Sequence, residues 1–147
     1  MSWRDGVSED AQGELDALFS VAMSTAKSHL DEFGEYFPFG NCIKIGADRV
    51  TFNNVDMREE HPKSTDVISE LKIQYKQQMH KLSSISITYT ATLSDGSDAV
   101  VIECEHREGI AIQIFVSYKF KGFGKKKKVE FFMQSVGTAV IKPFIWN

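Results

Sequence analysis

Two apolar runs joined by a short charged turn occupy the middle of this chain, at residues 97–120. Directly before them, residues 84–93 alternate apolar side chains with serine and threonine. A two-residue period is typical of a β-strand with one packed face, and short turns join antiparallel neighbours. The pattern therefore predicts an antiparallel meander, with central strands at about 84–94, 98–106 and 110–120.

Two amphipathic helices are expected before this meander. Apolar residues recur every three or four positions through residues 11–33, with Ser8 as the N-cap and Gly34 as the residue that ends the helix. A second stripe of this spacing runs through residues 67–82, and we expect Pro62 and Ser64 to open that helix.

Short strands are also expected at residues 41–45, 50–53 and 129–134, where apolar and β-branched side chains gather between turn residues. The fold class predicted is α+β, with an antiparallel sheet of about five to six strands and two helices packed on one of its faces. A chain of 147 residues, 42% apolar and 25% charged, is typical of one globular domain, so we expect a single domain over 1–147.

Neither a membrane nor an oxidising compartment is indicated. The first residues lack the basic and apolar segments of a secretion signal, and no apolar stretch approaches the length needed to span a bilayer. The two cysteines, Cys42 and Cys104, have no metal-binding or redox spacing. We therefore predict a reduced, cytoplasmic protein that does not associate with membranes.

The charges are distributed unevenly along the chain. Residues 1–70 carry 14 acidic and 6 basic side chains, whereas residues 71–147 carry 6 acidic and 11 basic ones. An acidic surface can steer a basic protein partner to its site. The residues predicted to form such a protein-binding surface are Asp31, Glu32, Glu35, Asp56, Glu59 and Glu60.

One run of lysines stands against this acidic surface, at residues 125–128. Lysines beside Phe120 and Phe123 have the composition of a nucleic-acid contact. A charge run between two strands is more often a solvated loop, and the whole chain has a net charge of −3. The sequence therefore makes nucleic acid an unlikely partner.

An aromatic segment follows the first helix at residues 35–40. One interpretation is a plug that closes the core, with Phe37 and Phe39 buried against the helix and Gly40 in a turn. The other is the wall of a pocket whose polar group is Glu35 or Tyr36. We favour the plug.

The meander also carries an alternative site made of Glu103, Glu105 and His106. The two glutamates are two positions apart on a strand and share a face, whereas His106 points to the other face. A carboxylate pair can hold a divalent cation or act as acid and base, which would suit a small hydrolase or metal enzyme. The favoured interpretation is a charged, solvent-facing row. No catalytic residue, metal or cofactor is predicted.

On several short motifs the chain resembles a family of small, mostly uncharacterised bacterial proteins. The motifs are Gly-Glu-aromatic-Phe-Pro-Phe-Gly at 34–40, His-Pro at 61–62, Asp-Ala-Val at 98–100 and Glu-His-Arg-Glu-Gly at 105–109. The chain departs from the family pattern at Ser117, where proline is usual. Some proteins of this size and pattern look like immunity partners of secreted bacterial toxins.

Together, these features favour a protein that acts by binding another protein. The function predicted is an immunity protein that neutralises a basic bacterial toxin domain by forming a stoichiometric complex. Two alternatives stay open: an enzyme that uses the face of Glu103 and Glu105, and a module that binds a small molecule.

Overall fold

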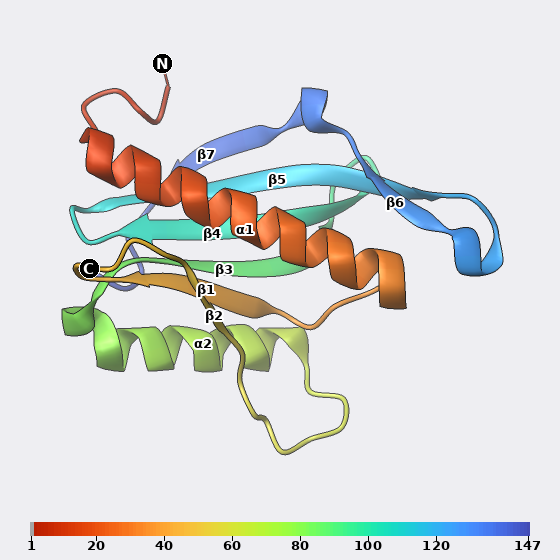
Figure 1. Ribbon diagram of the computed structural model, residues 1–147, viewed down its shortest axis with the longest axis horizontal. Coiled ribbons are helices and arrows are strands. Elements are labelled where there is room, and N and C mark those ends of the chain that lie inside the picture. Colours follow the sequence, from red (N-terminus) through yellow and green to blue (C-terminus); the bar gives the residue numbers. More distant parts are fainter. Residues whose placement is uncertain (1) are drawn as a thin grey trace.

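Figure 1 shows the helices and the curled antiparallel sheet of the computed structural model, which describes residues 2–147. The α+β class predicted from the sequence is confirmed. In chain order, the elements are α1 (Glu9–Phe33), β1 (Phe39–Lys44), β2 (Thr51–Asn53), α2 (Ser64–Gln78), β3 (Leu82–Thr92), β4 (Asp98–His106), β5 (Ile110–Lys121), β6 (Lys128–Phe131) and β7 (Gly137–Ile141). Short 3₁₀ turns lie at Met79–Lys81, Gly124–Lys126 and Met133–Ser135.

The sheet is a seven-stranded antiparallel sheet with the order β2-β1-β3-β4-β5-β6, and β7 also pairs with β5. The meander of β3, β4 and β5 matches the three central strands that the sequence predicts. β5 is long enough to pair with two strands along its outer edge. Its residues 111–115 pair with β7, and its residues 118–121 pair with β6.

α1 covers one face of this sheet. Ser8 caps the helix by accepting a hydrogen bond from the backbone N–H of Ala11 at 3.1 Å, and Gly34 ends it with a left-handed φ of 76°. Both caps agree with the prediction. The buried stripe of α1 packs with alternate residues of the central strands, among them Ile102 on β4 and Ile112 on β5.

The other face is covered by α2 and by the last residues of the chain. Leu71 and Tyr75 of α2 pack with Ile85 and Ile87 of β3 and with Ile145. Neighbouring residues on β1 show the division, since Ile43 belongs to the cluster of α1 and Cys42 to the cluster of α2. Neighbouring side chains on a strand point to opposite faces of the sheet, so α1 and α2 pack against opposite faces. The expected packing of both helices on one face is not confirmed.

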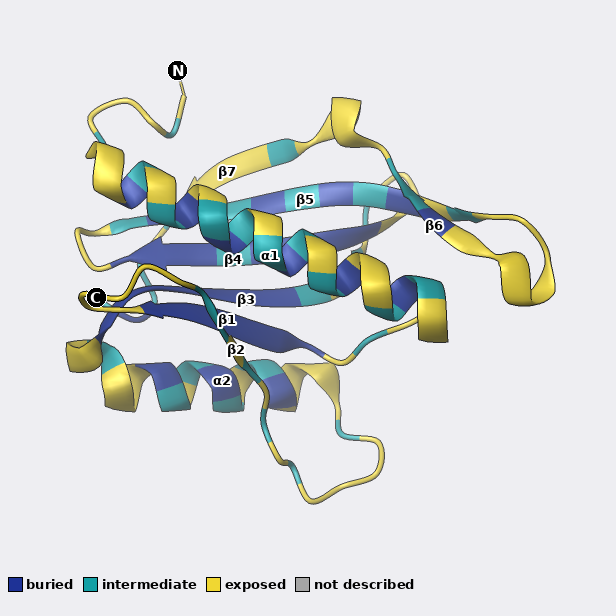
Figure 2. Ribbon diagram, viewed as in Figure 1, coloured by how far each residue is buried: buried dark blue, intermediate teal, exposed yellow. Residues whose placement is uncertain are grey.

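The hydroxyl-rich side of β3 lies under α1. Ser84, Ser86 and Thr88 are fully buried, so the expectation that only one face of this strand is packed is wrong. Figure 2 shows the central strands buried, whereas β7 and the hairpin between β5 and β6 are mostly exposed. The period of two predicted the strand correctly, and the second covering layer explains the burial of both of its faces.

The two cysteines are free and buried. Cys42 belongs to the cluster under α2, and Cys104 to the cluster under α1. Burial raises the pKa of both thiols, so neither thiol is activated. Within residues 2–147, neither helix is long and apolar enough to cross a membrane.

Candidate functional site: an aromatic groove with an acidic rim

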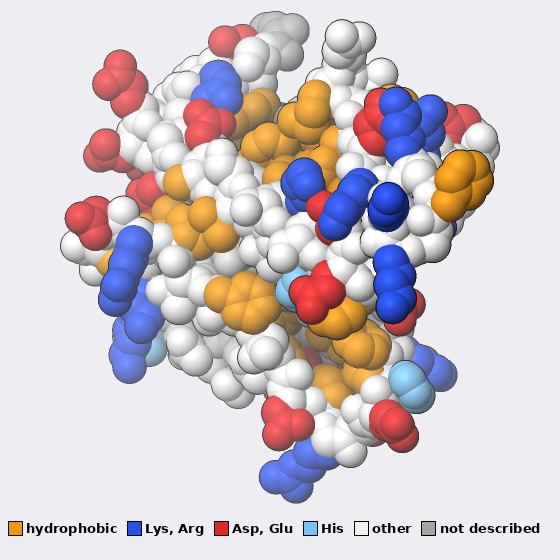
Figure 3. All heavy atoms as spheres, turned by 45° about the vertical axis from the view of Figure 1, so that its right-hand side comes forward, with side chains coloured by type: hydrophobic (Ala, Val, Ile, Leu, Met, Phe, Trp, Pro, Cys, Tyr) orange, Lys and Arg blue, Asp and Glu red, His pale blue; other side chains and the backbone are white. Residues whose placement is uncertain are grey.

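A cavity of about 520 Å³ opens between the end of α1, the segment after it and β2. We call it the aromatic pocket. Its rings are Phe33, Tyr36, Phe37, Phe39 and Phe52, and its polar side chains are His29, Glu35, Asn54 and Ser64. Figure 3 shows hydrophobic side chains gathered on this side of the molecule, with acidic side chains next to them.

The floor of the aromatic pocket is well packed, while its walls are open to solvent. Phe39 is only 2% exposed, and its ring lies 5.6 Å from those of Tyr36 and Phe52. Phe33, Phe37 and Phe52 are 66%, 54% and 46% exposed. The segment thus combines the two interpretations of the sequence: Phe39 plugs the core as predicted, but the predicted burial of Phe37 is wrong because its ring is part of the pocket wall.

A second cavity, of about 250 Å³, continues the first one along the loop between β2 and α2. It shares Phe37, Pro38 and Asn54 with the aromatic pocket. Its rim carries the carboxylates of Asp56, Glu59 and Glu60, so we call it the acidic pocket. The two cavities together form the aromatic–acidic groove, and among residues 2–147 no lysine or arginine lines either of them.

The loop of the acidic pocket is shaped by its own side chains. The Asp56 carboxylate accepts the backbone N–H of Arg58 at 3.1 Å, and Arg58 has a left-handed φ of 56°. A short polar side chain that bonds to the backbone two residues later forms a tight turn. The side chains of Glu59 and Glu60 follow that turn and are exposed.

Four of the six acidic residues predicted to bind a partner therefore meet at this groove: Glu35, Asp56, Glu59 and Glu60. Asp31 and Glu32 lie on the other side of Phe33. They line a cavity of about 330 Å³ between α1 and the β5–β6 hairpin, which we call the junction pocket. The sequence therefore predicts most of the acidic rim. It does not show that the six residues are divided between two separate cavities.

Asp31 has a structural role in the junction pocket. Its carboxylate accepts a hydrogen bond from Lys27 at 2.7 Å and another from the backbone N–H of Val129 at 2.7 Å. The Lys27 ammonium and the backbone donor lower the pKa of Asp31. Because both of its oxygens are engaged, Asp31 ties α1 to β6 and is a poor candidate for contact with a partner.

Comparison with known proteins adds nothing to this geometry. Neither the protein-family models, nor the curated proteins, nor the solved structures give a match. The motif resemblance described above therefore stays a prediction, and the case for the site depends on its residues.

The alternative site is divided between separate environments. Glu105 is fully buried, and its carboxylate accepts the backbone N–H groups of Phe144, Ile145 and Trp146 at 2.7–2.8 Å. Successive N–H groups of this kind form a nest for an anion. The expectation that Glu105 belongs to a solvent-facing row is wrong, because the end of the chain folds over this part of β4.

Glu103 lies on the same face, but in a cluster of its own. It accepts the hydroxyl of Tyr89 at 2.6 Å and the amide of Gln113 at 3.3 Å, and Lys72 lies 3.8 Å away. Burial, followed by the Glu103 carboxylate, raises the pKa of Tyr89. The side chain of Glu103 is only 14% exposed, so Glu103 is also not part of an open charged row.

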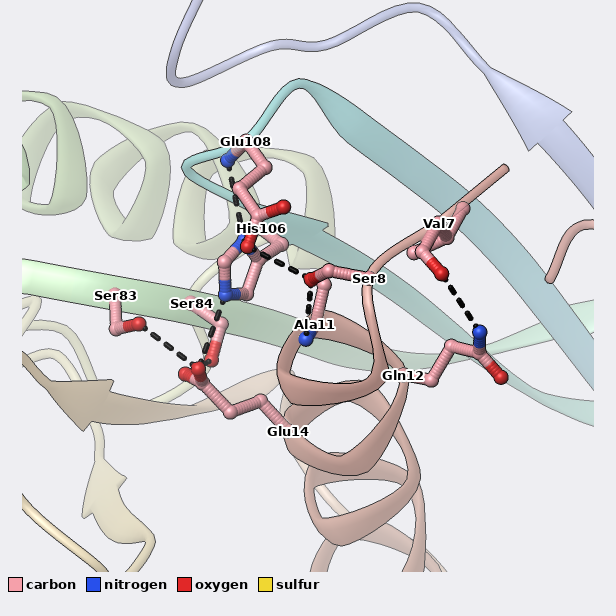
Figure 4. A network of polar contacts seen from close by, with 9 residues as sticks. All are labelled: Val7, Ser8, Ala11, Gln12, Glu14, Ser83, Ser84, His106 and Glu108. Carbon is pink, nitrogen blue, oxygen red and sulfur yellow. Dashed lines mark hydrogen bonds and ion pairs between the residues drawn. The ribbon is translucent and has the colours of Figure 1, made fainter. Parts of the chain in front are cut away.

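His106 points to the opposite face, as predicted, and is 2% exposed. Figure 4 shows it pointing toward Glu14 of α1, with Nε2 at 3.0 Å from the carboxylate. The backbone N–H of Glu108 donates to Nδ1 at 3.1 Å, which leaves Nε2 to donate to the Glu14 carboxylate. Ser83 and Ser84 donate to the same carboxylate at 3.0 and 2.9 Å.

This network has the residue types of a catalytic triad, but a different order of contacts. Glu14 is the hub, and both serines donate to it, whereas a nucleophilic serine would donate to the histidine. Partial burial raises the pKa of Glu14, but hydrogen bonds from Ser83, His106 and Ser84 outweigh it and leave the pKa below its ordinary value. The network therefore fastens α1 to β3 and β4.

No group of three or more His, Cys, Asp or Glu side chains is placed to hold a metal ion anywhere in residues 2–147. The features that sequence reasoning missed are the exposed rings of Phe33 and Phe52 and the position of His29 at the pocket. Phe33 continues the apolar stripe of α1, and this spacing assigns it to the core. The available signal was its position on the last turn, where a helix extends past the sheet that it covers.

Proposed function

We propose that this protein acts by binding a basic protein partner in the aromatic–acidic groove and forms a stoichiometric complex with it. In the form that the sequence predicts, the partner is a bacterial toxin domain and this chain is its immunity protein. The observation that carries the proposal is the pairing of exposed phenylalanine rings with a rim of carboxylates.

This combination suits cationic side chains. The face of an aromatic ring is negative and attracts an ammonium or guanidinium group, especially where water is partly excluded. Glu35 lies at the aromatic pocket itself, and Glu59 and Glu60 extend the negative charge along the groove. A lysine or arginine of a partner would therefore find a ring and a carboxylate in the same place.

The charge of the groove also suits the kind of partner proposed. Domains that bind or cleave nucleic acid carry basic surfaces because they must hold phosphates. An acidic groove opposite such a surface would cover it and speed up association. Cytoplasmic residence belongs to the same proposal, since an immunity protein meets its toxin inside the cell it protects.

The enzyme alternative is weaker because the side chains of Glu103, Glu105 and His106 already form hydrogen bonds with other groups of this chain. A small organic cation is the second candidate ligand. The volume of the aromatic pocket, about 520 Å³, is within the range of small-molecule sites. A complex with another protein and a complex with a small cation are distinguished by the experiment below.

The decisive test is co-expression with the product of the adjacent gene, followed by co-purification and a growth assay. We expect a one-to-one complex and loss of toxicity. Glu59→Lys combined with Phe37→Ser should weaken the complex, and Asp48→Lys, which is exposed in the β1–β2 turn, serves as the charge control. If the neighbour stays toxic and no complex forms, the proposal fails; if the purified chain binds only a small cation, the second candidate replaces it.

A further inference from the structure

The hairpin between β5 and β6 extends beyond the body of the molecule (Figure 1). Its tip, residues 122–127, carries Phe123, which is 94% exposed, more than any other large hydrophobic side chain described. The strands pair as far as Lys121 and Lys128, so the tip begins where the sheet ends. A single exposed ring is common on protein surfaces, so the meaning of Phe123 depends on the charges beside it and on the groove at the same end of the molecule.

The tip has a defined conformation. Gly122 has a φ of 97°, and a Cβ there would lie 2.7 Å from the carbonyl oxygen of Lys126. The carbonyl of Phe123 accepts the N–H of Lys126 at 3.1 Å, and the carbonyl of Gly124 accepts the N–H of Lys127 at 3.2 Å. The turn therefore presents the Phe123 ring outward on a hydrogen-bonded support.

The charge of the tip is mostly uncompensated. Lys127 lies over the ring of Phe120 at 4.6 Å, and Lys121 pairs with Glu130 at 2.7 Å. Within residues 2–147, Lys125, Lys126 and Lys128 have no carboxylate within 4.0 Å. The tip thus offers one exposed aromatic ring together with the ammonium groups of Lys125 and Lys126, which pair with no carboxylate of the described residues.

The tip and the aromatic–acidic groove lie at the same end of the molecule. Lys125 and Lys127 line the junction pocket together with Phe33, and Phe33 also lines the aromatic pocket. Only the last turn of α1 separates them. One end of the protein therefore carries a basic aromatic projection beside an acidic aromatic cavity.

We propose that two copies of this chain associate through this end, each inserting its hairpin tip into the groove of the other. Phe123 of one copy enters the aromatic pocket of the second copy, and its lysines approach Glu35, Asp56, Glu59 and Glu60 there. Because tip and groove are close together, one two-fold axis satisfies both contacts at once, and the assembly closes as a dimer.

The observations favour a second copy over a nucleic acid or an anionic membrane. Both halves of the complementary pair are present in this chain, with opposite charge and matching aromatic character. A polyanion that approached the tip would also meet the carboxylates of Asp31 and Glu32 at the junction pocket. Those carboxylates repel phosphates, whereas they do not repel the lysines of a second copy's tip.

The dimer would occupy the groove that the proposed function uses, but the two proposals can fail separately. Dimerisation is measured on the purified chain alone, and the proposed function on a complex with another protein. If both hold, self-association competes with the partner, and Phe123→Ser should increase the fraction of chain available to that partner.

The test is sedimentation equilibrium over a concentration series at low and at high salt. We expect a monomer–dimer equilibrium that salt weakens. Phe123→Ser should raise the dimer Kd by at least about tenfold, the change expected from losing about 1.4 kcal/mol. Val140→Ser is the matched control, because Val140 is 63% exposed on β7, away from the tip, and should leave the Kd unchanged.

A charge exchange identifies the contact. Glu59→Lys/Glu60→Lys and Lys126→Glu/Lys127→Glu should each be monomeric alone and should form a heterodimer when mixed, since both tip–groove contacts then join opposite charges. A carbodiimide cross-link between these lysines and glutamates, detected between isotopically distinct copies, would locate the contact between the tip of one copy and the groove of the other. A chain that is monomeric throughout, a dimer insensitive to Phe123→Ser, or a mixture that stays monomeric would overturn the proposal.

Discussion

The carboxylate of Glu105 accepts the backbone N–H of Ile145 at 2.8 Å, and both residues are fully buried. The residues on either side of Ile145 donate to the same carboxylate. The contact joins the centre of the sheet to a segment 40 positions later in the chain. One buried carboxylate thus holds the segment that closes the core under α2.

Glu105→Gln should destabilise the protein. An amide keeps one acceptor oxygen and turns a donor group toward N–H groups that need an acceptor, so at least one buried donor loses its partner. The expected cost is about 1–3 kcal/mol in the free energy of unfolding, measured by urea denaturation. Glu103→Gln is the control and should cost less, because Glu103 is partly exposed. Equal costs for the two variants would contradict this account.

The Glu14 network should make stability depend on pH in the acid range. The pKa of Glu14 is below its ordinary value of 4.5 in the folded protein, so its stabilising effect is complete at neutral pH and is lost as the pH falls below that value. Glu14→Gln should flatten the fall in unfolding free energy between about pH 5 and pH 3. Glu32→Gln, farther along the same helix, should leave this pH dependence unchanged. If both variants flatten the fall in unfolding free energy equally, the Glu14 network is not its cause.

Gly40→Ala should be strongly destabilising, although Gly40 lies in β1 and not in the turn that the sequence suggests. A Cβ at this position would overlap the hydroxyl of Tyr75, which donates to Asn53 at 2.9 Å. Tyr75→Phe removes that hydroxyl. The substitution should therefore lower the free energy of unfolding less in the Gly40→Ala background than in the native protein. A double-mutant cycle measures the difference, and strict additivity would show that the two groups do not meet.

Phe39 and Phe37 should separate stability from binding. Phe39→Ala removes a ring that is 2% exposed and should cost about 3–5 kcal/mol in the free energy of unfolding. Phe37→Ala removes a ring that is 54% exposed, so it should change stability little and weaken binding to the groove. Thermal unfolding and a binding titration of both variants provide the comparison. Equal stability losses would mean that the Phe37 ring is packed, contrary to the structure.

Local patterns predicted the elements well because each element follows a local rule. Ser8 and Gly34 cap α1 as expected, and the alternation after residue 84 marks the meander. Which face each helix covers is not a local property. The sequence places Glu105 and His106 correctly on opposite faces of β4, but cannot show that Ile145 and Glu14 come from distant parts of the chain to meet them.

The candidate site was predicted in part for the same reason. Acidic residues can be read from the sequence, and four of the six line the groove. The cavity itself depends on where α1 ends relative to β2, and this decides that Phe33 and Phe52 are walls of a pocket. The structural role of Asp31 could not be read from the sequence, because its hydrogen-bond donor, the N–H of Val129, is 98 positions away.

Such separations also bear on how quickly the protein folds. Three contacts that fasten α1 to the sheet, Ser8 to Glu108, Glu14 to His106 and Asp31 to Val129, span 100, 92 and 98 positions. Closing loops of this length is slow, and chains dominated by distant contacts fold in milliseconds to seconds. We therefore expect the docking of α1 on the sheet to be a slow step in folding.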